Sequence, residues 1–210
     1  MDEKIRSDAN RGMIQTDFRD FAQGYFGRLT TALDHIPLDY VETLASALTI
    51  AWQRNRQVFI FGNGGSAGNA IHLANDFLYG ISKQFGHALR VTALPANPAV
   101  ITCLANDIGY DGIFCHQLSV LAESGDIAIA LSGSGNSPNI LRALEYCAQN
   151  NIESFAILGY SGGRAKELAK HAIHVPVDDM QVSEDLQLVV GHLMMQWLYS
   201  KREICKSKIK

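Results

Sequence analysis

Between residues 57 and 182 the sequence alternates short apolar runs with segments of helical period, and this alternation restricts the fold more than any other feature. The apolar runs are rich in β-branched residues and occupy 58–61, 89–94, 126–131, 154–158 and 172–177. Strands that alternate with helices form βαβ units, in which helices cover both faces of a parallel sheet. The pattern therefore predicts an α/β fold with a five-stranded parallel sheet in a three-layer α/β/α sandwich.

Helical patterns flank this region on both sides. Apolar residues recur every three or four positions from Phe18 to Leu29, and Pro37 separates them from a second amphipathic run that begins at Leu38. Ser183 is the expected N-cap of a last amphipathic helix. We therefore expect one domain, with N-terminal helices over 1–57, a parallel α/β core over 58–182, and a C-terminal helix and tail over 183–210.

Composition and charge exclude several classes of protein. Hydrophobic residues make up 47% of the chain and charged residues 19%, which is typical of a globular protein with a substantial core. The net charge of −3 gives no electrostatic basis for binding nucleic acid. Residues 1–11 are charged throughout, unlike a signal peptide, and no stretch approaches the ~18 apolar residues of a membrane span. We expect a cytoplasmic protein that binds neither nucleic acid nor membranes.

Two turns rich in glycine and serine follow strands of the predicted sheet. The sequence SGSGNSP at 132–138 and the sequence GNGGS at 62–66 each lie between an apolar run and a helical segment. The free N–H groups and the dipole at a helix N-terminus favour an anion, whereas a flexible linker rarely interrupts a strand–helix unit. Because ligands of parallel sheets bind at the carboxyl ends of strands, both turns can face one crevice. We predict a phosphate site there.

The common nucleotide-binding patterns do not fit these turns. Gly62, Gly64 and Gly68 form G-x-G-x-x-x-G, which is one residue longer than the dinucleotide fingerprint. The next strand ends in the sequence LPAN at 94–97, without the acid that a dinucleotide site needs. The chain also contains no nucleotide P-loop.

Two pairs of ionisable residues are candidates for chemistry. His72 and Asp76 are four residues apart on one helical face, which suits acid–base catalysis or metal binding, or else a local hydrogen bond. Glu184 and His192 lie on the last helix, where a glutamate can complement the helix dipole and a histidine can belong to the core or to an interface. Eight residues span ~12 Å of helix, so one ion cannot bind both unless Glu184 precedes the helix or the two serve different copies of the site.

Three motifs together resemble the phosphoheptose isomerases of the sugar isomerase (SIS) fold. They are G-N-G-G-S at 62–66, N-D-x-G-[YF] at 106–110 and S-x-S-G-N-S at 132–137, and the resemblance covers nearly the whole chain. It implies an SIS-type sandwich with an N-terminal helical extension, and a homotetramer with sites at subunit interfaces. It also implies aldose–ketose isomerisation of sedoheptulose 7-phosphate to a D-glycero-D-manno-heptose 7-phosphate type product, for heptose and surface-glycan biosynthesis.

The resemblance implies a set of substrate contacts. The residues expected to hold the phosphate are Ser66, Ser132, Ser134 and Ser137. Those expected to contact the sugar or shape its pocket are Asn63, Gly64, Gly65, Asp76, Asn106, Asp107, Gly133 and Glu184.

The resemblance further implies a zinc site and a catalytic pair, with two departures from the family. The expected Zn²⁺ ligands are His72, Asp76, Glu184 and His192, where the family has Glu in place of Asp76 and Gln in place of Glu184. We expect Asp76 to be the base and His192, supplied by another subunit, to be the acid. An Asp carboxylate lies roughly 1–1.5 Å behind that of a Glu, and errors of ~1 Å can cost ~100-fold in rate, so Glu184 could instead be the base.

Two other functions remain open at this point. SIS-fold proteins also include non-catalytic regulators that bind sugar phosphates or protein partners. The same site could also isomerise a different sugar phosphate.

Overall fold

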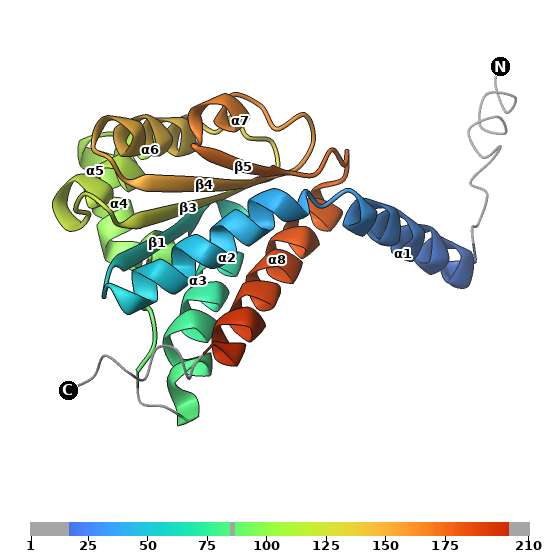
Figure 1. The fold of residues 1–210 in the computed structure, drawn as a ribbon. Helices are drawn as coiled ribbons and strands as arrows, with labels where there is room; N and C mark the ends of the chain where they lie inside the picture. The colour runs from blue at the N-terminus through green and yellow to red at the C-terminus, as the bar shows by residue number, and fades with distance from the viewer. Residues whose placement is uncertain (1–16, 85–86, 202–210) are drawn as a thin grey trace, which may run out of the picture.

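A computed structural model describes residues 17–84 and 87–201 and shows an α/β/α sandwich (Figure 1). Its sheet has five parallel strands in the order β2-β1-β3-β4-β5. The strands are β1 (Gln57–Gly62), β2 (Arg90–Ala93), β3 (Ile127–Ser132), β4 (Glu153–Leu158) and β5 (His171–His174). The predicted fold class is thus confirmed, and the strand ends differ from the predicted ones by three residues at most.

The two faces of the sheet carry separate hydrophobic cores, and β1 contributes alternate residues to each. Val58 and Ile60 pack with α2 (Leu38–Gln53), α3 (Gly64–Asn75) and α8 (Met180–Ser200). Phe59 and Phe61 pack on the other face with α5 (Ile113–Leu121) and α6 (Pro138–Gln149). Burial on both faces explains the continuous apolar runs, because the helices leave no solvent-facing side for polar residues. The second face also carries α4 (Pro98–Asp107) and α7 (Ala165–Leu168).

The strand order places a switch point between β1 and β3. From β1 the chain continues to β2 on one side, and from β2 it crosses to β3 on the other side of β1. Gly62, the last residue of β1, pairs with Leu131 near the end of β3. The two glycine- and serine-rich turns therefore leave neighbouring strands at the same edge, where open α/β sheets bind ligands.

The last helix begins earlier than predicted. Asp179, not Ser183, is the N-cap of α8, and its carboxylate accepts hydrogen bonds from the N–H groups of Gln181 and Val182 at 3.1 and 3.2 Å. Ser183 lies inside the first turn, where its hydroxyl donates to the carbonyl of Asp179. Glu184 is therefore a helical residue, and the possibility that it precedes the helix is wrong.

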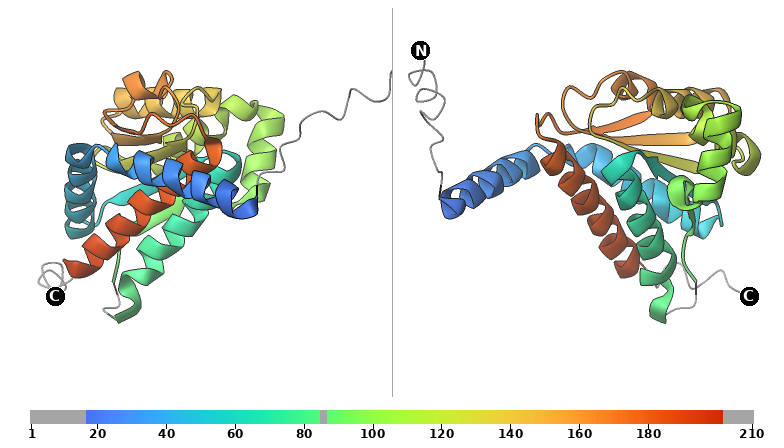
Figure 2. Two further views of the ribbon diagram at one scale, coloured as in Figure 1. Left: turned by 90° about the vertical axis from the view of Figure 1, so that its right-hand side faces the viewer. Right: turned by 180° about the vertical axis from the view of Figure 1, so that it is seen from behind.

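Helix α1 (Phe18–Asp34) extends away from the sandwich and is joined to it near the start of α2 and α8 (Figure 2). The parts of the predicted terminal segments at 1–16 and 202–210 lie outside the described residues. Among the residues that the structure does describe, no helix is both long enough and apolar enough to span a bilayer.

Candidate functional site

The turns after β1 and β3 line a single cavity of about 260 Å³. The predicted substrate residues around it are Asn63, Gly64, Gly65, Ser66, Ser132, Gly133, Ser134, Ser137 and Glu184. Leu131 and Met180 complete the lining. The structure therefore brings both polar turns together with the first turn of α8, as the position of the switch point requires.

The serine-rich turn is held by its own hydrogen bonds. The hydroxyl of Ser132 accepts from the N–H of Gly135 at 3.0 Å, and the hydroxyl of Ser134 accepts from the N–H of Asn136 at 3.3 Å. Ser137 is the N-cap of α6, but its side chain makes no capping hydrogen bond. None of these three hydroxyls donates to another described residue, so each O–H is available to an anion in the cavity.

Ser66 depends on a residue that the sequence analysis missed. Its hydroxyl accepts from the side-chain amide of Gln187 at 3.0 Å, and the Gln187 carbonyl accepts from Asn69 at 3.0 Å. Gln187 is 1% exposed, so it must be hydrogen-bonded, and these contacts satisfy it. In the sequence, this role is indicated only by a glutamine among the apolar residues of α8. Gln187 fixes Ser66 at the edge of the cavity.

Glu184 lies against the start of α3. A Cβ atom at Gly65 would be 2.3 Å from both carboxylate oxygens of Glu184, so a side chain there would displace the carboxylate from this position. The carboxylate thus lies at a helix N-terminus, where the dipole favours a negative charge. It also lines the cavity directly.

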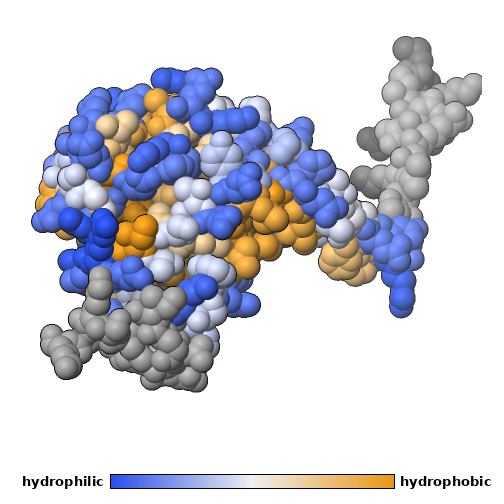
Figure 3. Space-filling view, in the orientation of Figure 1, coloured by the Kyte–Doolittle hydropathy of each residue, from blue (hydrophilic) through white to orange (hydrophobic). Residues whose placement is uncertain are grey.

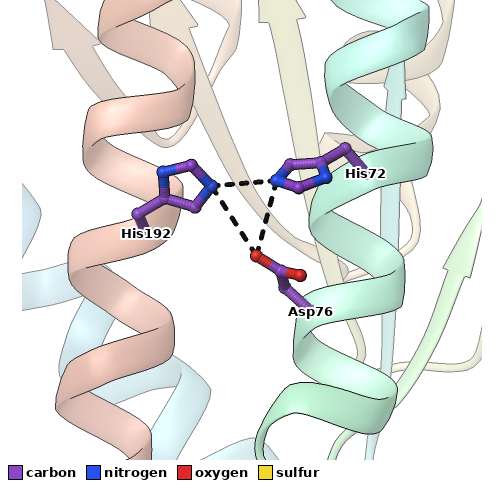
Figure 4. Close-up of side chains that lie close together, drawn as sticks. All are labelled: His72, Asp76 and His192. Atoms are coloured by element: carbon purple, nitrogen blue, oxygen red, sulfur yellow. Dashed lines mark hydrogen bonds and ion pairs between the residues drawn. The ribbon is translucent and has the colours of Figure 1, made fainter.

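His72, Asp76 and His192 converge in a second group farther along α3 and α8 (Figure 4). Nε2 of His72 is 2.9 Å from Nε2 of His192, and Oδ2 of Asp76 lies 3.5 and 3.6 Å from these two nitrogens. The side chain of Asp76 is 18% exposed, whereas the imidazoles are 47% and 44% exposed. All three residues belong to one chain, so the expectation that His192 comes from another subunit is not needed to form the group.

Close packing of the two helices produces this convergence. A Cβ atom at Gly191 would lie 2.2 Å from Cδ2 of Leu73, which brings the helix backbones together just beside His192. Asp76 begins a π-helical turn, η1 (Asp76–Gly80), which continues α3. Such turns are frequent at functional sites, and this one follows the last turn of α3, in which Asp76 has ordinary helical backbone angles and shares a face with His72.

The structure does not bring every predicted residue to these two places. Asn106 and Asp107 are exposed at the end of α4, where their side chains bond to each other at 2.8 Å, and neither lines the cavity. From the same motif, Tyr110 lines the adjacent hollow, and its hydroxyl donates to Oδ1 of Asn63, which does line the cavity, at 3.0 Å. Among the described residues Glu184 is not part of the group of His72, Asp76 and His192, since it lies two turns of α8 before His192.

A larger hollow of about 400 Å³ lies at the opposite edge of the sheet. It is bounded by α2 and by the amino ends of β3 and β4, and includes Arg54, Arg56 and Glu153. Ligands of parallel sheets bind at the carboxyl ends of the strands, so the candidate site is the cavity between the two turns.

Comparison with known proteins gives the family. Residues 24–159 match the SIS domain. The chain is 34% identical to a phosphoheptose isomerase of Akkermansia muciniphila over 78% of this chain and 85% of the relative, and 33% identical to phosphoheptose isomerase 2 of Campylobacter jejuni over 74% and 79%. A phosphoheptose isomerase structure from Francisella tularensis shares the fold with a TM-score of 0.81 at 23% identity, over 87% of this chain and 96% of that one. The chain therefore belongs to the SIS domain family and, within it, to the phosphoheptose isomerases.

Proposed function

We propose that this aldose–ketose isomerase interconverts sedoheptulose 7-phosphate and a D-glycero-D-manno-heptose 7-phosphate type product, in heptose and surface-glycan biosynthesis. The observation that carries the proposal is the cavity between the two polar turns, where hydroxyl and N–H donors gather at the switch point of the sheet. Family membership supplies the reaction class, and the cavity supplies a place for a phosphorylated ligand.

In this proposal the serine hydroxyls bind the phosphate. Ser66, Ser132, Ser134 and Ser137 come from both turns and line one cavity. The N-terminus of α6 adds the positive end of its dipole, which favours a dianion over the neutral sugar. Within the cavity the proposed sugar contacts are Asn63, Gly64, Gly65, Gly133 and Glu184, because Asn106 and Asp107 lie outside it, and Asp76 would meet the sugar from the His–Asp group.

Asp76 and His192 are the proposed acid–base pair. Isomerisation moves a proton between adjacent carbons and needs an acid for the carbonyl oxygen. Oδ2 of Asp76 lies 3.6 Å from Nε2 of His192, so a carboxylate and an imidazole are available side by side. Asp76 is the base and His192 the acid.

The donor set at Asp76 also fits a zinc ion. Ligand atoms of a tetrahedral zinc ion with bonds of ~2.0–2.1 Å lie about 3.3 Å apart, and catalytic sites use three protein ligands with one open position. The three separations of 2.9, 3.5 and 3.6 Å among His72, Asp76 and His192 bracket this value. A zinc ion bound there would polarise a carbonyl oxygen. Because it would take up Oδ2 of Asp76 and Nε2 of His192, these two atoms act as the acid–base pair only without the ion.

The decisive experiment is incubation of the purified protein with sedoheptulose 7-phosphate, followed by product analysis by NMR. A heptose 7-phosphate product supports the proposal. Turnover of another sugar phosphate instead would show that the enzyme has a different substrate. Binding of a sugar phosphate without turnover would indicate a regulator.

The phosphate site has its own test. Ser134→Ala removes one donor, so KM for the sugar phosphate should rise ~10-fold or more, as expected for a hydrogen bond to a charged group worth ~1.5–3 kcal/mol. Ser119→Ala, on the exposed end of α5, is the matched control and should leave KM unchanged. Equal KM values for Ser134→Ala and the wild type would remove Ser134 from the phosphate site.

A further inference from the structure

The amide of Asn63 is held by a hydrogen-bond network that reaches it from outside the cavity. Asn139 and Asn63 face each other as a bidentate pair: Nδ2 of Asn63 donates to Oδ1 of Asn139 at 2.9 Å, and Nδ2 of Asn139 donates to Oδ1 of Asn63 at 2.8 Å. We propose that Asn139 is a positioning residue, which holds Asn63 as a hydrogen-bond donor toward an oxygen of the substrate.

The orientation of Asn139 is set by the backbone of α6. The N–H of Ile140 donates to Oδ1 of Asn139 at 2.9 Å. The same N–H also donates to the carbonyl of Ser137, the N-cap residue, at 3.0 Å, so it is shared between two oxygens. A backbone N–H can only donate, so the side-chain atom of Asn139 that faces it must be an acceptor. The carboxamide oxygen of Asn139 must therefore face Ile140, and its NH₂ group must point toward Asn63. Asn139 is 1% exposed, so no water competes for these contacts.

The fixed amide of Asn139 in turn fixes that of Asn63. Oδ1 of Asn63 accepts from both Asn139 and the hydroxyl of Tyr110, so both of its lone pairs are used. One hydrogen of the Asn63 Nδ2 group goes to Asn139. The second hydrogen has no acceptor among the described residues. Asn63 is thus able to donate one more hydrogen bond and unable to accept one.

The spare donor lies at the substrate cavity. Asn63 lines both the 260 Å³ cavity between the turns and the neighbouring hollow bounded by Tyr110, Asp111 and Ser137. A fixed N–H donor in such a site stabilises negative charge that develops on an oxygen, as in an enediolate. This role rests on the proposed function, since it assumes that the sugar occupies the cavity. Asn139 borders the neighbouring hollow but does not line the 260 Å³ cavity, so its proposed effect on an oxygen in that cavity passes through Asn63.

The substitution Asn139→Asp tests this role because a carboxyl group changes its hydrogen-bonding with pH. When protonated it can donate to Oδ1 of Asn63 and accept from Nδ2, as the amide does; when ionised it can only accept. At neutral pH we expect kcat to fall at least ~10-fold, which is less than the ~100–1000-fold seen when a donor to a developing oxyanion is removed, because Asn63 itself is retained. As the pH falls through the pKa of this carboxyl, which burial raises and the N-terminus of α6 lowers, the ratio of variant to wild-type kcat should recover toward one.

Nearby ionisable groups and a control variant determine how the ratio of variant to wild-type kcat is interpreted. Tyr110 and Asp111 line the adjacent hollow, and Asp111 is paired with Arg142 at 2.8 Å, so the same groups are present in both enzymes and cancel in the ratio. Asn150→Asp, at the exposed far end of α6, introduces the same charge away from the site and should keep the ratio near one at every pH. Thermal unfolding at each pH separates loss of fold from loss of kcat.

Asn63→Asp keeps the proposal testable if Asn139→Asp does not fold. A protonated carboxyl at position 63 has a single hydrogen, which Oδ1 of Asn139 takes, so kcat should stay low at every pH. A constant activity ratio for Asn139→Asp, or wild-type kcat for Asn63→Asp at neutral pH, would overturn the inference. An inactive wild type with sedoheptulose 7-phosphate would instead refute the proposed function, and the ratios would then be measured with the sugar phosphate that it does accept.

Discussion

Asp76 stands where the resemblance implies a glutamate, yet its carboxylate reaches both imidazoles. Oδ2 lies 3.5 Å from His72 and 3.6 Å from His192, so the shorter side chain has not left the group. Asp76 has ordinary helical backbone angles, and the close approach of α8 at Gly191 brings His192 to it. At the residue scale, the packing of the two helices therefore keeps the shorter carboxylate within reach of both imidazoles.

The base can be identified by changing each carboxylate to its amide. Asp76→Asn keeps size and hydrogen bonding but removes the base, so kcat should fall at least the ~100-fold typical of a general base. Glu184→Gln restores the residue type that the resemblance implies and serves as the matched comparison. If Asp76→Asn stays active while Glu184→Gln does not, the base is Glu184. Steady-state kinetics with sedoheptulose 7-phosphate decides between them.

The residues that could be predicted from the sequence are those that share a local motif. Asn63, Ser66, Ser132 and Ser137 each follow a buried strand, and the carboxyl ends of neighbouring parallel strands must meet at one edge. Gln187 contacts Ser66 on α3, and Asn139 contacts Asn63 between β1 and α3. Each pair is far apart in the sequence, so only the packed structure brings its members together. Asn106 and Asp107 were predicted by resemblance alone, and the described chain places them outside the cavity.

At the scale of elements, the contact between α3 and α8 determines whether the His–Asp group forms. His72 and Asp76 lie on one helix and His192 on the other, and Gly191 leaves no room for a side chain between them. Sequence period predicted both helices, because apolar faces repeat every three or four residues. It could not predict their distance, which depends on one glycine facing the buried Leu73.

Gly191→Ala should push the two helices apart. Alanine favours a helix over glycine by about 1 kcal/mol, but overpacking against a buried leucine costs ~1–3 kcal/mol, so we expect a net loss of stability and weaker zinc binding. Denaturant unfolding and zinc titration measure the two effects. Gly68→Ala is the matched control, because the space around Gly68 on α3 is open and alanine there should stabilise the protein.

A double-mutant cycle tests whether the contact between Gly191 and Leu73 limits the approach of the two helices. Leu73→Ala alone should destabilise by ~2–5 kcal/mol through loss of a buried side chain. Combined with Gly191→Ala, it removes the atoms that the new methyl group meets, so the pair should cost less than the sum of the single changes. Strict additivity of the two free energies would show that Gly191 and Leu73 do not limit the approach of the helices.

At the scale of the whole molecule, one chain leaves two apolar surfaces exposed, although the second half of α1 contacts α8 and its N-cap through Tyr25, Arg28 and Ala32. Helix α1 extends from the sandwich with Phe18, Phe21 and Phe26 exposed by 78%, 61% and 63% (Figure 2). Hydrophobic surface also gathers over the junction of α1, α2 and α8 (Figure 3). Monomeric proteins rarely expose such continuous apolar surface, which favours association between copies of this chain.

The distance between the phosphate cavity and the proposed base also favours association between copies of this chain. Ser66 and Asp76 are ten residues apart along α3 and its π-helical continuation, so roughly 15 Å of helix separates the phosphate cavity from the proposed base. A general base must lie within hydrogen-bond reach of the proton it removes. The phosphate and the reacting carbons are at opposite ends of the sugar, so the sugar itself covers part of this distance, and a His–Asp group supplied to the cavity by a second copy would cover the rest.

We therefore predict a homo-oligomer, and expect light scattering at micromolar concentration to give about four times the 23.0 kDa of the chain. Replacing Phe21 and Phe26 by Asp removes two side chains that each contribute ~1.5–3 kcal/mol when buried, so the assembly should dissociate. The smaller species should still bind zinc, because His72, Asp76 and His192 come from one chain, but should lose turnover. A wild-type monomer would contradict the assembly, and a fully active monomeric variant would show that the cavity and the His–Asp group of a single chain are sufficient.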